Sequence, residues 1–164
     1  MKDLLKTLND EKPAQVDFQL FDARLVATWE HLYLAALNAL VAFRSKCNIS
    51  KSLAVETLLY ASAQNQIQKA TRLFGIKPSS SDIAVLIVGE QSEPIRSALS
   101  TISEKIGGKR DDGVLELSEE KSESIRRFFG ISEDQLRTVK RGGSLERALV
   151  DLVIERVALV AVQS

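Results

Sequence analysis

The sequence predicts a single α+β domain in which a small mixed or antiparallel sheet is covered by helices. Residues 15–21 alternate between polar and apolar side chains, which is the pattern of a half-buried strand. Residues 82–89 contain an uninterrupted apolar run, Ile-Ala-Val-Leu-Ile-Val, which is typical of a strand covered on both faces. The chain has 164 residues, of which 45% are apolar. A chain of this size can bury roughly two-thirds of its unfolded surface in one core.

Two helical segments are expected on either side of the first strand. Residues 1–14 are polar and form a short helix or a loose arm. Thr28 can cap a second helix over residues 29–46. In that helix larger apolar residues recur with alanines between them: Leu32, Leu37, Leu40 and Val41 with Ala35, Ala36 and Ala39. Because small side chains permit close approach, this helix is expected to pack on the sheet.

The next segment reads as a pair of abutting helices. Ser50 can cap the first, which ends at about residue 61 and buries Val55, Leu58 and Leu59. Ser62 can cap the second, which starts near Ala63 and leaves backbone N–H groups unpaired in its first turn. Helical spacing places its buried stripe at Ile67, Ala70, Thr71 and Phe74, opposite Asn65, Lys69 and Arg72.

Basic and acidic residues are unevenly distributed along the chain, although the formal net charge is zero. Residues 44–77 carry six basic side chains and one acid, Glu56, and the remaining residues hold 16 basic and 21 acidic groups. Such asymmetry favours a polyanionic partner, and an ordinary solvated face is the alternative. The N-terminus of a helix carries the positive end of the helix dipole. Together with a cationic outer face, it can bind phosphate or the end of a nucleotide chain. The candidate RNA-binding residues are Arg44, Lys51, Gln64, Asn65, Gln66, Lys69, Arg72 and Lys77.

Beyond the second strand, capping signals predict three more helices. The first runs over residues 92–106 from a Ser92 cap and stops at Gly107-Gly108. Residues 114–117 are expected to be a strand remnant, and Ser118 then caps a helix that ends at Phe129-Gly130. Residues 132–135, Ser-Glu-Asp-Gln, have the spacing of a capping box at the start of a short helix.

The last helix, over residues 144–163, carries two apolar lines where a surface helix normally has one. Leu145, Leu149 and Leu152 form one line, and Val150, Val153, Val157 and Val160 form the other. The helix is therefore either a central core helix or one that turns its second line toward another chain. On the interface reading, residues 144–162 dock a partner through Leu149, Val150, Val153, Arg156, Val157 and Val160, and the valine line is expected to be exposed in the isolated chain.

Three motifs in residues 48–76 resemble the small kinase-binding subunit of the KEOPS complex of archaea and eukaryotes. They are Asn-Ile-Ser-Lys at 48–51, Glu-x-Leu-x-Tyr-Ala-Ser-Ala at 56–63 and Gln-Ile-x-x-Ala at 66–70, followed by Phe-Gly-Ile at 74–76. The resemblance extends upstream to Phe-Asp-Ala-Arg at 21–24 and Glu-His-Leu at 30–32, and downstream to residues 82–89 and the last helix.

This resemblance implies a non-catalytic subunit. KEOPS attaches a threonylcarbamoyl group to the adenosine beside the anticodon of tRNAs. Its transferase performs the chemistry, a small atypical kinase acting as an ATPase binds the transferase, and members of this family bind the kinase. The implied direct partners are the kinase, through the last helix, and tRNA, through its 3′ CCA end; the transferase and dimerising subunits are indirect partners.

The residues themselves offer little chemistry. His31 is the only histidine, and Cys47 lacks the context of a nucleophile. No Cys/His cluster has metal-ligand spacing, so neither a metal nor a cofactor is expected. The glycines at 142–143 before Ser144 lack the spacing of a phosphate-binding loop, and a loop in which Ser144 caps the last helix is expected instead. A single cysteine and the lack of a signal or membrane-spanning run predict a cytoplasmic protein. The missing catalytic groups, together with the resemblance, predict that it is not an enzyme.

Three functional hypotheses follow. The leading one is an adaptor that docks on the kinase and tethers tRNA. The second is a purely protein-binding regulator of the kinase with no direct RNA role. The third is an enzyme that acts on a small ligand between the sheet and the helices, and the missing base and nucleophile argue against it. Self-association through the valine line is a separate possibility.

Overall fold

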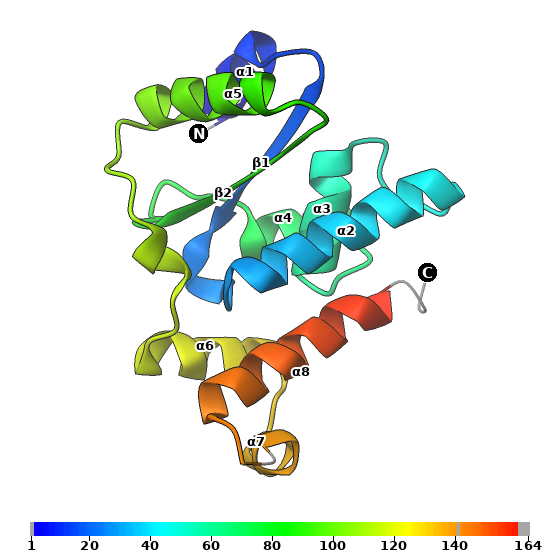
Figure 1. Ribbon diagram of the computed structural model, residues 1–164, viewed down its shortest axis with the longest axis vertical. Coiled ribbons are helices and arrows are strands. Elements are labelled where there is room, and N and C mark those ends of the chain that lie inside the picture. The colour runs from blue at the N-terminus through cyan, green and yellow to red at the C-terminus, as the bar shows by residue number, and fades with distance from the viewer. Residues whose placement is uncertain (1, 141, 161–164) are drawn as a thin grey trace.

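A computed structural model describes residues 2–140 and 142–160, which form an α+β domain built in layers. The first and fifth helices cover one face of a two-stranded sheet, the second to fourth helices lie on the other side, and the last three helices form a further layer below them (Figure 1). The elements are α1 (Lys2–Glu11), β1 (Val16–Asp22), a 3₁₀ turn η1 (Ala23–Leu25), α2 (Trp29–Ser45), α3 (Leu53–Ala61), α4 (Ile67–Phe74), β2 (Ile83–Gly89), α5 (Ser92–Ile106), a 3₁₀ turn η2 (Asp112–Leu115), α6 (Glu119–Phe129), α7 (Glu133–Lys140) and α8 (Leu145–Val160).

The sheet is antiparallel, and both expected strands are present. Its register runs from Val16 opposite Gly89 to Asp22 opposite Ile83. Phe18 and Leu20 are buried against α1 and α5, as the alternation in β1 predicts. The expectation that β2 is covered on both faces is wrong, because only Ala84 is fully buried and its neighbours are half-buried.

The predicted strand at residues 114–117 is also wrong. The segment begins with the 3₁₀ turn η2, in which the Asp111 carboxylate accepts the N–H of Gly113 at 2.9 Å. The Lys121 ammonium group on α6 then donates to the carbonyl oxygens of Val114 and Glu116, at 2.6 and 3.2 Å. These bonds satisfy carbonyl groups that a third strand would have needed for pairing with the sheet.

The alanine-rich face of α2 is buried, but it packs mainly on helices. Ala35, Ala36, Ala39 and Ala42 are in the core, where α2 contacts α3 and α8. Small side chains let these helices approach closely, and of the larger apolar residues in the prediction only Leu32 is buried with them. Leu37, Leu40 and Val41 are exposed.

The boundaries of the α3–α4 pair differ from the prediction. Ser52 caps α3 in place of Ser50, and its hydroxyl accepts the N–H of Val55. Ser62 ends α3, because its hydroxyl donates to the carbonyl oxygens of Leu58 and Leu59 at 2.8 and 3.2 Å. The fourth helix therefore starts at Ile67, where Gln66 provides no side-chain cap. Of the expected stripe, Ala70 and Phe74 are buried, and Ile67 and Thr71 are exposed.

Several local signals in the second half are confirmed. Ser118 caps α6, and Ser144 accepts the N–H of Arg147 at the start of α8. Ser132 and Gln135 form the predicted capping box, since each side chain accepts the other's backbone N–H, at 3.2 and 2.9 Å. Gly107 ends α5 with a positive φ of 69°. None of the described helices has the length and apolar character needed to cross a bilayer.

Both apolar lines of α8 lie largely in the core, which contradicts the expected exposure of the valine line. Val153 and Val157 have no exposed surface, Val150 and Val160 are buried, and so are Leu149 and Leu152. The helix packs on α2 and α3 along one side and on α6 and α7 along the other, so each line has an intramolecular partner. Residues 161–163 of the predicted helix lie outside the described residues.

Candidate binding surfaces

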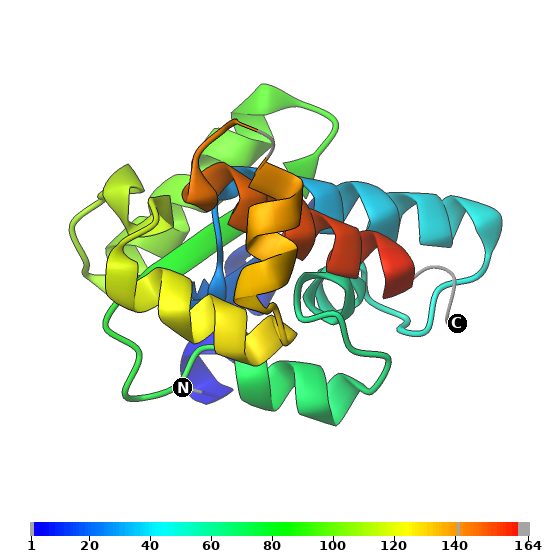
Figure 2. The ribbon, with the colours of Figure 1, turned by 90° about the horizontal axis from the view of Figure 1, so that it is seen from below.

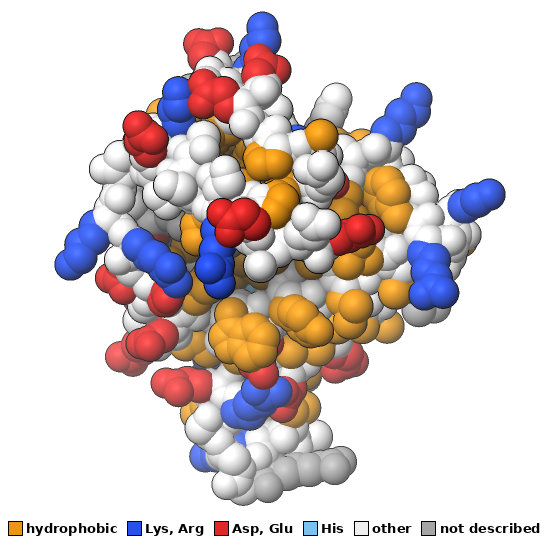
Figure 3. Space-filling model, turned by 45° about the horizontal axis from the view of Figure 1, so that its top comes forward, with side chains coloured by type: hydrophobic (Ala, Val, Ile, Leu, Met, Phe, Trp, Pro, Cys, Tyr) orange, Lys and Arg blue, Asp and Glu red, His pale blue; other side chains and the backbone are white. Residues whose placement is uncertain are grey.

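Among the described residues, a stripe of exposed apolar side chains runs along α2. Its members are Trp29, Tyr33, Leu37, Leu40 and Val41, and we call them the α2 stripe. Trp29 and Tyr33 are 62% and 60% exposed and Val41 is 54% exposed, values far above those of core residues. Figure 3 shows hydrophobic side chains in a row over this helix. Exposed apolar patches of this kind mark interaction sites.

The stripe is held in a defined geometry at its first turn. The rings of Trp29 and Tyr33 meet edge to face, with centroids 6.1 Å apart. Beside them the Arg147 guanidinium on α8 pairs with both carboxylate oxygens of Glu30, at 3.0 and 2.9 Å. Trp29, Glu30 and Arg147 also line an open cleft of about 710 Å³ that reaches Leu117 and Val150. The stripe therefore begins beside a hollow with a charged wall.

A buried histidine fixes the position of α2 relative to α3. His31 accepts the N–H of Ala27 at Nδ1, at 3.2 Å, and its Nε2 lies 2.8 Å from the Ala61 carbonyl oxygen. The imidazole is therefore neutral with its proton on Nε2. Burial is the main cause that lowers the pKa of His31 to about 4, with a smaller contribution from Lys121. This residue has a structural role and lies out of contact with solvent.

The residues predicted to bind the kinase are mostly inaccessible. Leu149, Val150, Val153, Val157 and Val160 are buried. Arg156 is half-buried, and its Nε lies 3.5 Å from the Phe129 carbonyl oxygen. The exposed apolar side chains of α8 are instead Leu145 and Leu159. Sequence reasoning missed Trp29 and Tyr33, although their spacing of four residues on the face opposite the alanines was a usable signal.

The predicted RNA-binding residues are accessible, but they come from two parts of the fold. Arg44 ends α2 and Lys51 lies in the loop before α3, whereas Lys69 and Arg72 lie on α4 and Lys77 follows it. The third helix packs against both α2 and α4 (Figure 2). Basic side chains stand out over the end of α2 in Figure 3. Among the described residues, no ion pair neutralises any of these five cations.

A buried carboxylate shapes the basic loop after α2. Glu56 is 1% exposed, and its two oxygens accept the N–H of Ile49 at 3.2 and 3.1 Å and the N–H of Ser50 at 2.7 Å. Because α3 is packed in the core, these bonds hold residues 49–50 in one conformation. The adjacent Lys51 is thereby placed at the surface.

The polar residues after α3 line a small hollow. Gln64 and Asn65, with Ala63 and Val160, surround a hollow of about 190 Å³. Ala63 has a positive φ of 50°, which turns the chain sharply there. Gln64, Asn65 and Gln66 are consecutive in the segment between α3 and α4, and Gln66 is exposed just before α4 begins. The hollow places Gln64 and Asn65 beside Val160 at the end of α8, whereas Arg44 lies at the end of α2.

The two charged residues of the Phe-Asp-Ala-Arg motif, Asp22 and Arg24, stabilise the end of β1. Burial opposes ionisation of Asp22, but hydrogen bonds from Arg24 and Ser80 outweigh it and lower the pKa to about 2. The Ser80 hydroxyl donates at 2.8 Å and ties the end of β1 to the segment before β2. Within the described residues, no three His, Cys, Asp or Glu side chains are grouped so that they could hold a metal ion.

An α+β domain that exposes an apolar helix face beside a basic helix end has the surface of a macromolecule-binding protein. Residues 1–161 match the family model described as kinase binding protein CGI-121, and the chain belongs to this family. It is 36% identical to the regulatory protein Cgi121 of Methanocaldococcus jannaschii over 143 residues, which are 87% of this chain and 82% of that protein. It is 33% identical to the EKC/KEOPS complex subunit CGI121 of Candida glabrata over 94 residues, which are 57% of this chain and 54% of that subunit. The resemblance seen in residues 48–76 is thus confirmed.

Proposed function

We propose that this protein is a regulatory subunit of KEOPS that binds the kinase of the complex through the α2 stripe and helps to recruit tRNA through its basic residues. The family description and the KEOPS name of the Candida glabrata relative support the first half. The observation that carries the proposal is the exposure of five large apolar side chains along one helix. Aromatic residues at the centre of an interface contribute most of the binding energy.

The proposed kinase surface replaces the one predicted on α8. The burial of the valine line argues against it as the main kinase contact and as a surface for self-association. The exposed Leu159 on the last turn of α8 is a candidate for the rim of the interface. Arg147 and Glu30 supply a charged pair next to the stripe that can discriminate between partners.

The RNA half of the proposal is supported by charge and position. Arg44 lies on the same helix as the α2 stripe, one turn beyond Val41, so a kinase docked on the stripe would lie beside the basic end. The hollow formed by Gln64 and Asn65 is polar and open, which suits the unpaired 3′ CCA end of a tRNA. Tethering there raises the effective concentration of tRNA at the transferase without contact to the modified base.

A capture experiment tests the kinase half. Leu37→Asp places a charge in the middle of the α2 stripe at an exposed position, so the domain should fold and fail to retain the purified kinase. Ser100→Asp, at an exposed position of α5, is the matched control and should retain the kinase fully. Undiminished capture by Leu37→Asp would contradict the docking surface.

Titration of tRNA with and without its terminal CCA tests the RNA half. The account predicts weaker binding of the truncated tRNA and a further loss when Asn65 and Gln66 are changed to alanine. Full stimulation of the kinase's ATPase activity without RNA, together with no binding of tRNA by the free subunit, would instead support the purely protein-binding regulator.

A further inference from the structure

The outer edge of β2 is open for pairing. The strand β1 occupies the inner edge of β2, and the described residues contain no further strand beside β2. The N–H of Ala23 donates to the Asp82 carbonyl oxygen at 3.0 Å, so Ala23 and Asp82, which are opposite each other, are a hydrogen-bonded pair of the ladder. Because hydrogen-bonded and non-bonded pairs alternate in an antiparallel ladder, Ala84, Leu86 and Val88 bond to β1. Residues 83, 85 and 87 therefore turn their N–H and C=O groups to the outer edge.

These outward groups have no partner among the described residues. Within residues 2–140 and 142–160, no backbone or side-chain hydrogen bond outside the ladder reaches the N–H or C=O of Ile83, Val85 or Ile87. An unpaired row of donors and acceptors is a template for another strand. The chemistry that satisfies it is an extended peptide backbone.

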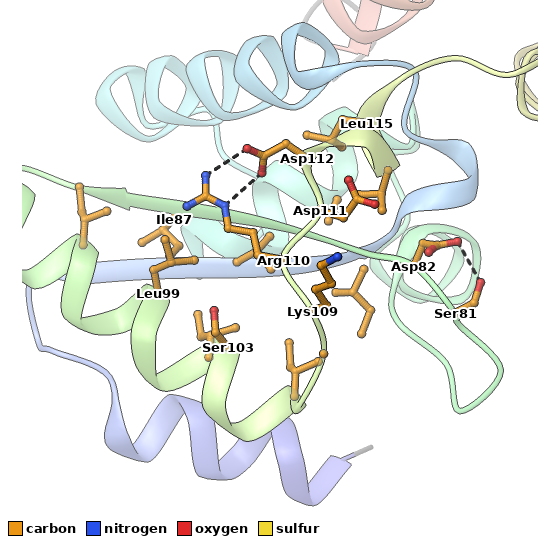
Figure 4. Close-up of a pocket in the computed structure, with 18 residues that line it drawn as sticks. Ser81, Asp82, Ile87, Leu99, Ser103, Lys109, Arg110, Asp111, Asp112 and Leu115 are labelled. Atoms are coloured by element: carbon orange, nitrogen blue, oxygen red, sulfur yellow. Dashed lines mark hydrogen bonds and ion pairs between the residues drawn. The ribbon is translucent and has the colours of Figure 1, made fainter.

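An apolar cleft lies beside the same edge. The side chains of Ile83, Val85 and Ile87 line it from β2, and Leu99, Ile102 and Ile106 line it from α5. Its volume is about 410 Å³. Figure 4 shows Ile87 and Leu99 pointing into one space. A strand paired with the outer edge would direct every second side chain into this cleft, since side chains of paired residues share a face.

The segment after α5 limits what can enter. Residues 107–112 cross the cleft without pairing with β2, and they carry Lys109, Arg110, Asp111 and Asp112 (Figure 4). The Arg110 guanidinium pairs with Asp112 at 3.1 Å. Charged groups next to an edge are the usual protection against sheet-to-sheet association. These charged groups disfavour pairing with the sheet of a second copy, so the expected occupant is a single extended segment.

We infer that the outer edge of β2 and its cleft form a docking site for an extended peptide segment of a partner protein, which adds to the sheet as a third strand. The segment carries apolar side chains at alternate positions, and its backbone supplies the bonds to residues 83, 85 and 87. The site lies on the α5 side of the sheet, away from α2 (Figure 1). Its edge residues are distinct from those proposed to bind the kinase and tRNA, but its cleft shares Asp112 and Leu115 with the open cleft beside Trp29 and Arg147.

A suitable probe is a labelled synthetic peptide that copies residues 16–22, Val-Asp-Phe-Gln-Leu-Phe-Asp, since this strand already pairs with the inner edge of β2. In a peptide that docks antiparallel to β2, as β1 does, the residues whose side chains enter the cleft are also those whose amides bond to β2. N-methylation of Phe18 and Leu20 in the peptide should therefore abolish binding. The matched peptide N-methylated at Asp17 and Gln19 should bind like the unmodified one.

Two protein variants provide the complementary comparison. Leu99→Lys puts an ammonium group into the cleft from α5 and should weaken peptide binding at least tenfold. Ser100→Lys adds the same charge at the neighbouring exposed position and should leave binding unchanged. Circular dichroism of both variants shows whether the fold is retained, and the pair of N-methylated peptides tests the site in the unaltered protein.

Hydrogen exchange of the backbone amides of β2, measured by NMR, tests directly whether the peptide pairs with the outer edge. Peptide binding should slow exchange at Ile83, Val85 and Ile87 while Ala84, Leu86 and Val88 change little. Absence of binding at about 1 mM peptide, equal binding of the two N-methylated peptides, or saturation without protection of the three amides would overturn the inference. Protection that appears on raising the protein concentration alone would also overturn it, in favour of pairing between two copies.

Discussion

The Nε2 atom of His31 in α2 lies 2.8 Å from the carbonyl oxygen of Ala61 at the end of α3. This bond requires a proton on Nε2, while Nδ1 accepts the N–H of Ala27 and cannot carry a second proton without losing that bond. The contact joins the helix that bears the α2 stripe to the helix that precedes the polar hollow. Only a neutral imidazole keeps both this bond and the bond from Ala27, because protonation of Nδ1 removes the latter.

This arrangement predicts a pH-dependent stability. The unfolded chain binds a proton on His31 near pH 6.5, whereas the folded chain does so only at about pH 4. The unfolded state is thus favoured as the pH falls, and the free energy of unfolding should decrease by roughly 3 kcal/mol between pH 7 and pH 4. Urea unfolding at several pH values measures the decrease. The stabilisation from Asp22, whose pKa is about 2, is lost only at lower pH.

The control for this experiment is His31→Gln, which lacks a titrating group at this position. Its free energy of unfolding at pH 7 should be lower than that of the unaltered protein. Between pH 7 and pH 4, however, the variant should lack the decrease in this free energy that His31 causes. If the variant shows the same slope as the unaltered protein, another group is responsible.

The burial of α8 predicts opposite results for two aspartate substitutions on that helix. Val153→Asp buries a charge without a partner and should prevent folding, because an isolated carboxylate is strongly disfavoured in a core. Leu159→Asp alters an exposed position and should leave the free energy of unfolding within about 0.5 kcal/mol of the original. Circular dichroism and urea titration distinguish them. A folded Val153→Asp protein would contradict the central position of α8.

The Glu56 carboxylate predicts a local effect on the basic loop. The two carboxylate oxygens of Glu56 accept the N–H groups of Ile49 and Ser50. In Glu56→Gln an NH₂ group replaces one of these oxygens and faces an N–H donor, so the free energy of unfolding should fall by about 2 kcal/mol. Amide exchange at Ile49 and Ser50 should accelerate more than exchange at the distant Ala84. Unchanged exchange at residues 49–50 would show that the loop is held by other contacts.

The basic residues predict a salt-dependent affinity for tRNA. Joint replacement of Lys51, Lys69 and Arg72 by glutamine should weaken binding and reduce the slope of log affinity against log salt by about 0.7 to 0.9 for each phosphate that the variant no longer neutralises. Replacement of Lys105, Arg127 and Arg137, which pair with neighbouring glutamates, is the matched control and should change the slope less. Equal slopes for the triple variant and the unaltered protein would remove the RNA half of the proposal.

Local signals in the sequence predicted much of the fold. The caps at Ser118 and Ser144 and the box of Ser132 and Gln135 depend on atoms within one turn, and all three formed. The prediction failed at Ser62, where the hydroxyl bonds to the preceding helix and cannot cap the following one. Both roles are available to a serine between two helices, and only the spatial path of the chain decides between them.

The binding surface was harder to predict because hydrophobicity alone does not separate core from interface. Both α2 and α8 carry more apolar residues than one stripe requires. The larger residues of α8 are covered by helices on two sides, whereas α2 is covered along one face, which holds the alanines, His31 and Leu32. This leaves Trp29 and Tyr33 in solvent. This difference arises from packing between segments more than a hundred residues apart, such as the contact of Glu30 with Arg147.

The central claim is that the kinase docks on the α2 stripe, and calorimetric titration of purified kinase tests it most directly. Trp29→Ala combined with Tyr33→Ala should weaken binding by about 30-fold or more, the loss typical of one or more central aromatic contacts. Ile67→Ala, which trims an exposed apolar side chain on α4, should bind as the unaltered protein does. Unchanged affinity in the double variant, with its fold intact, would contradict the claim.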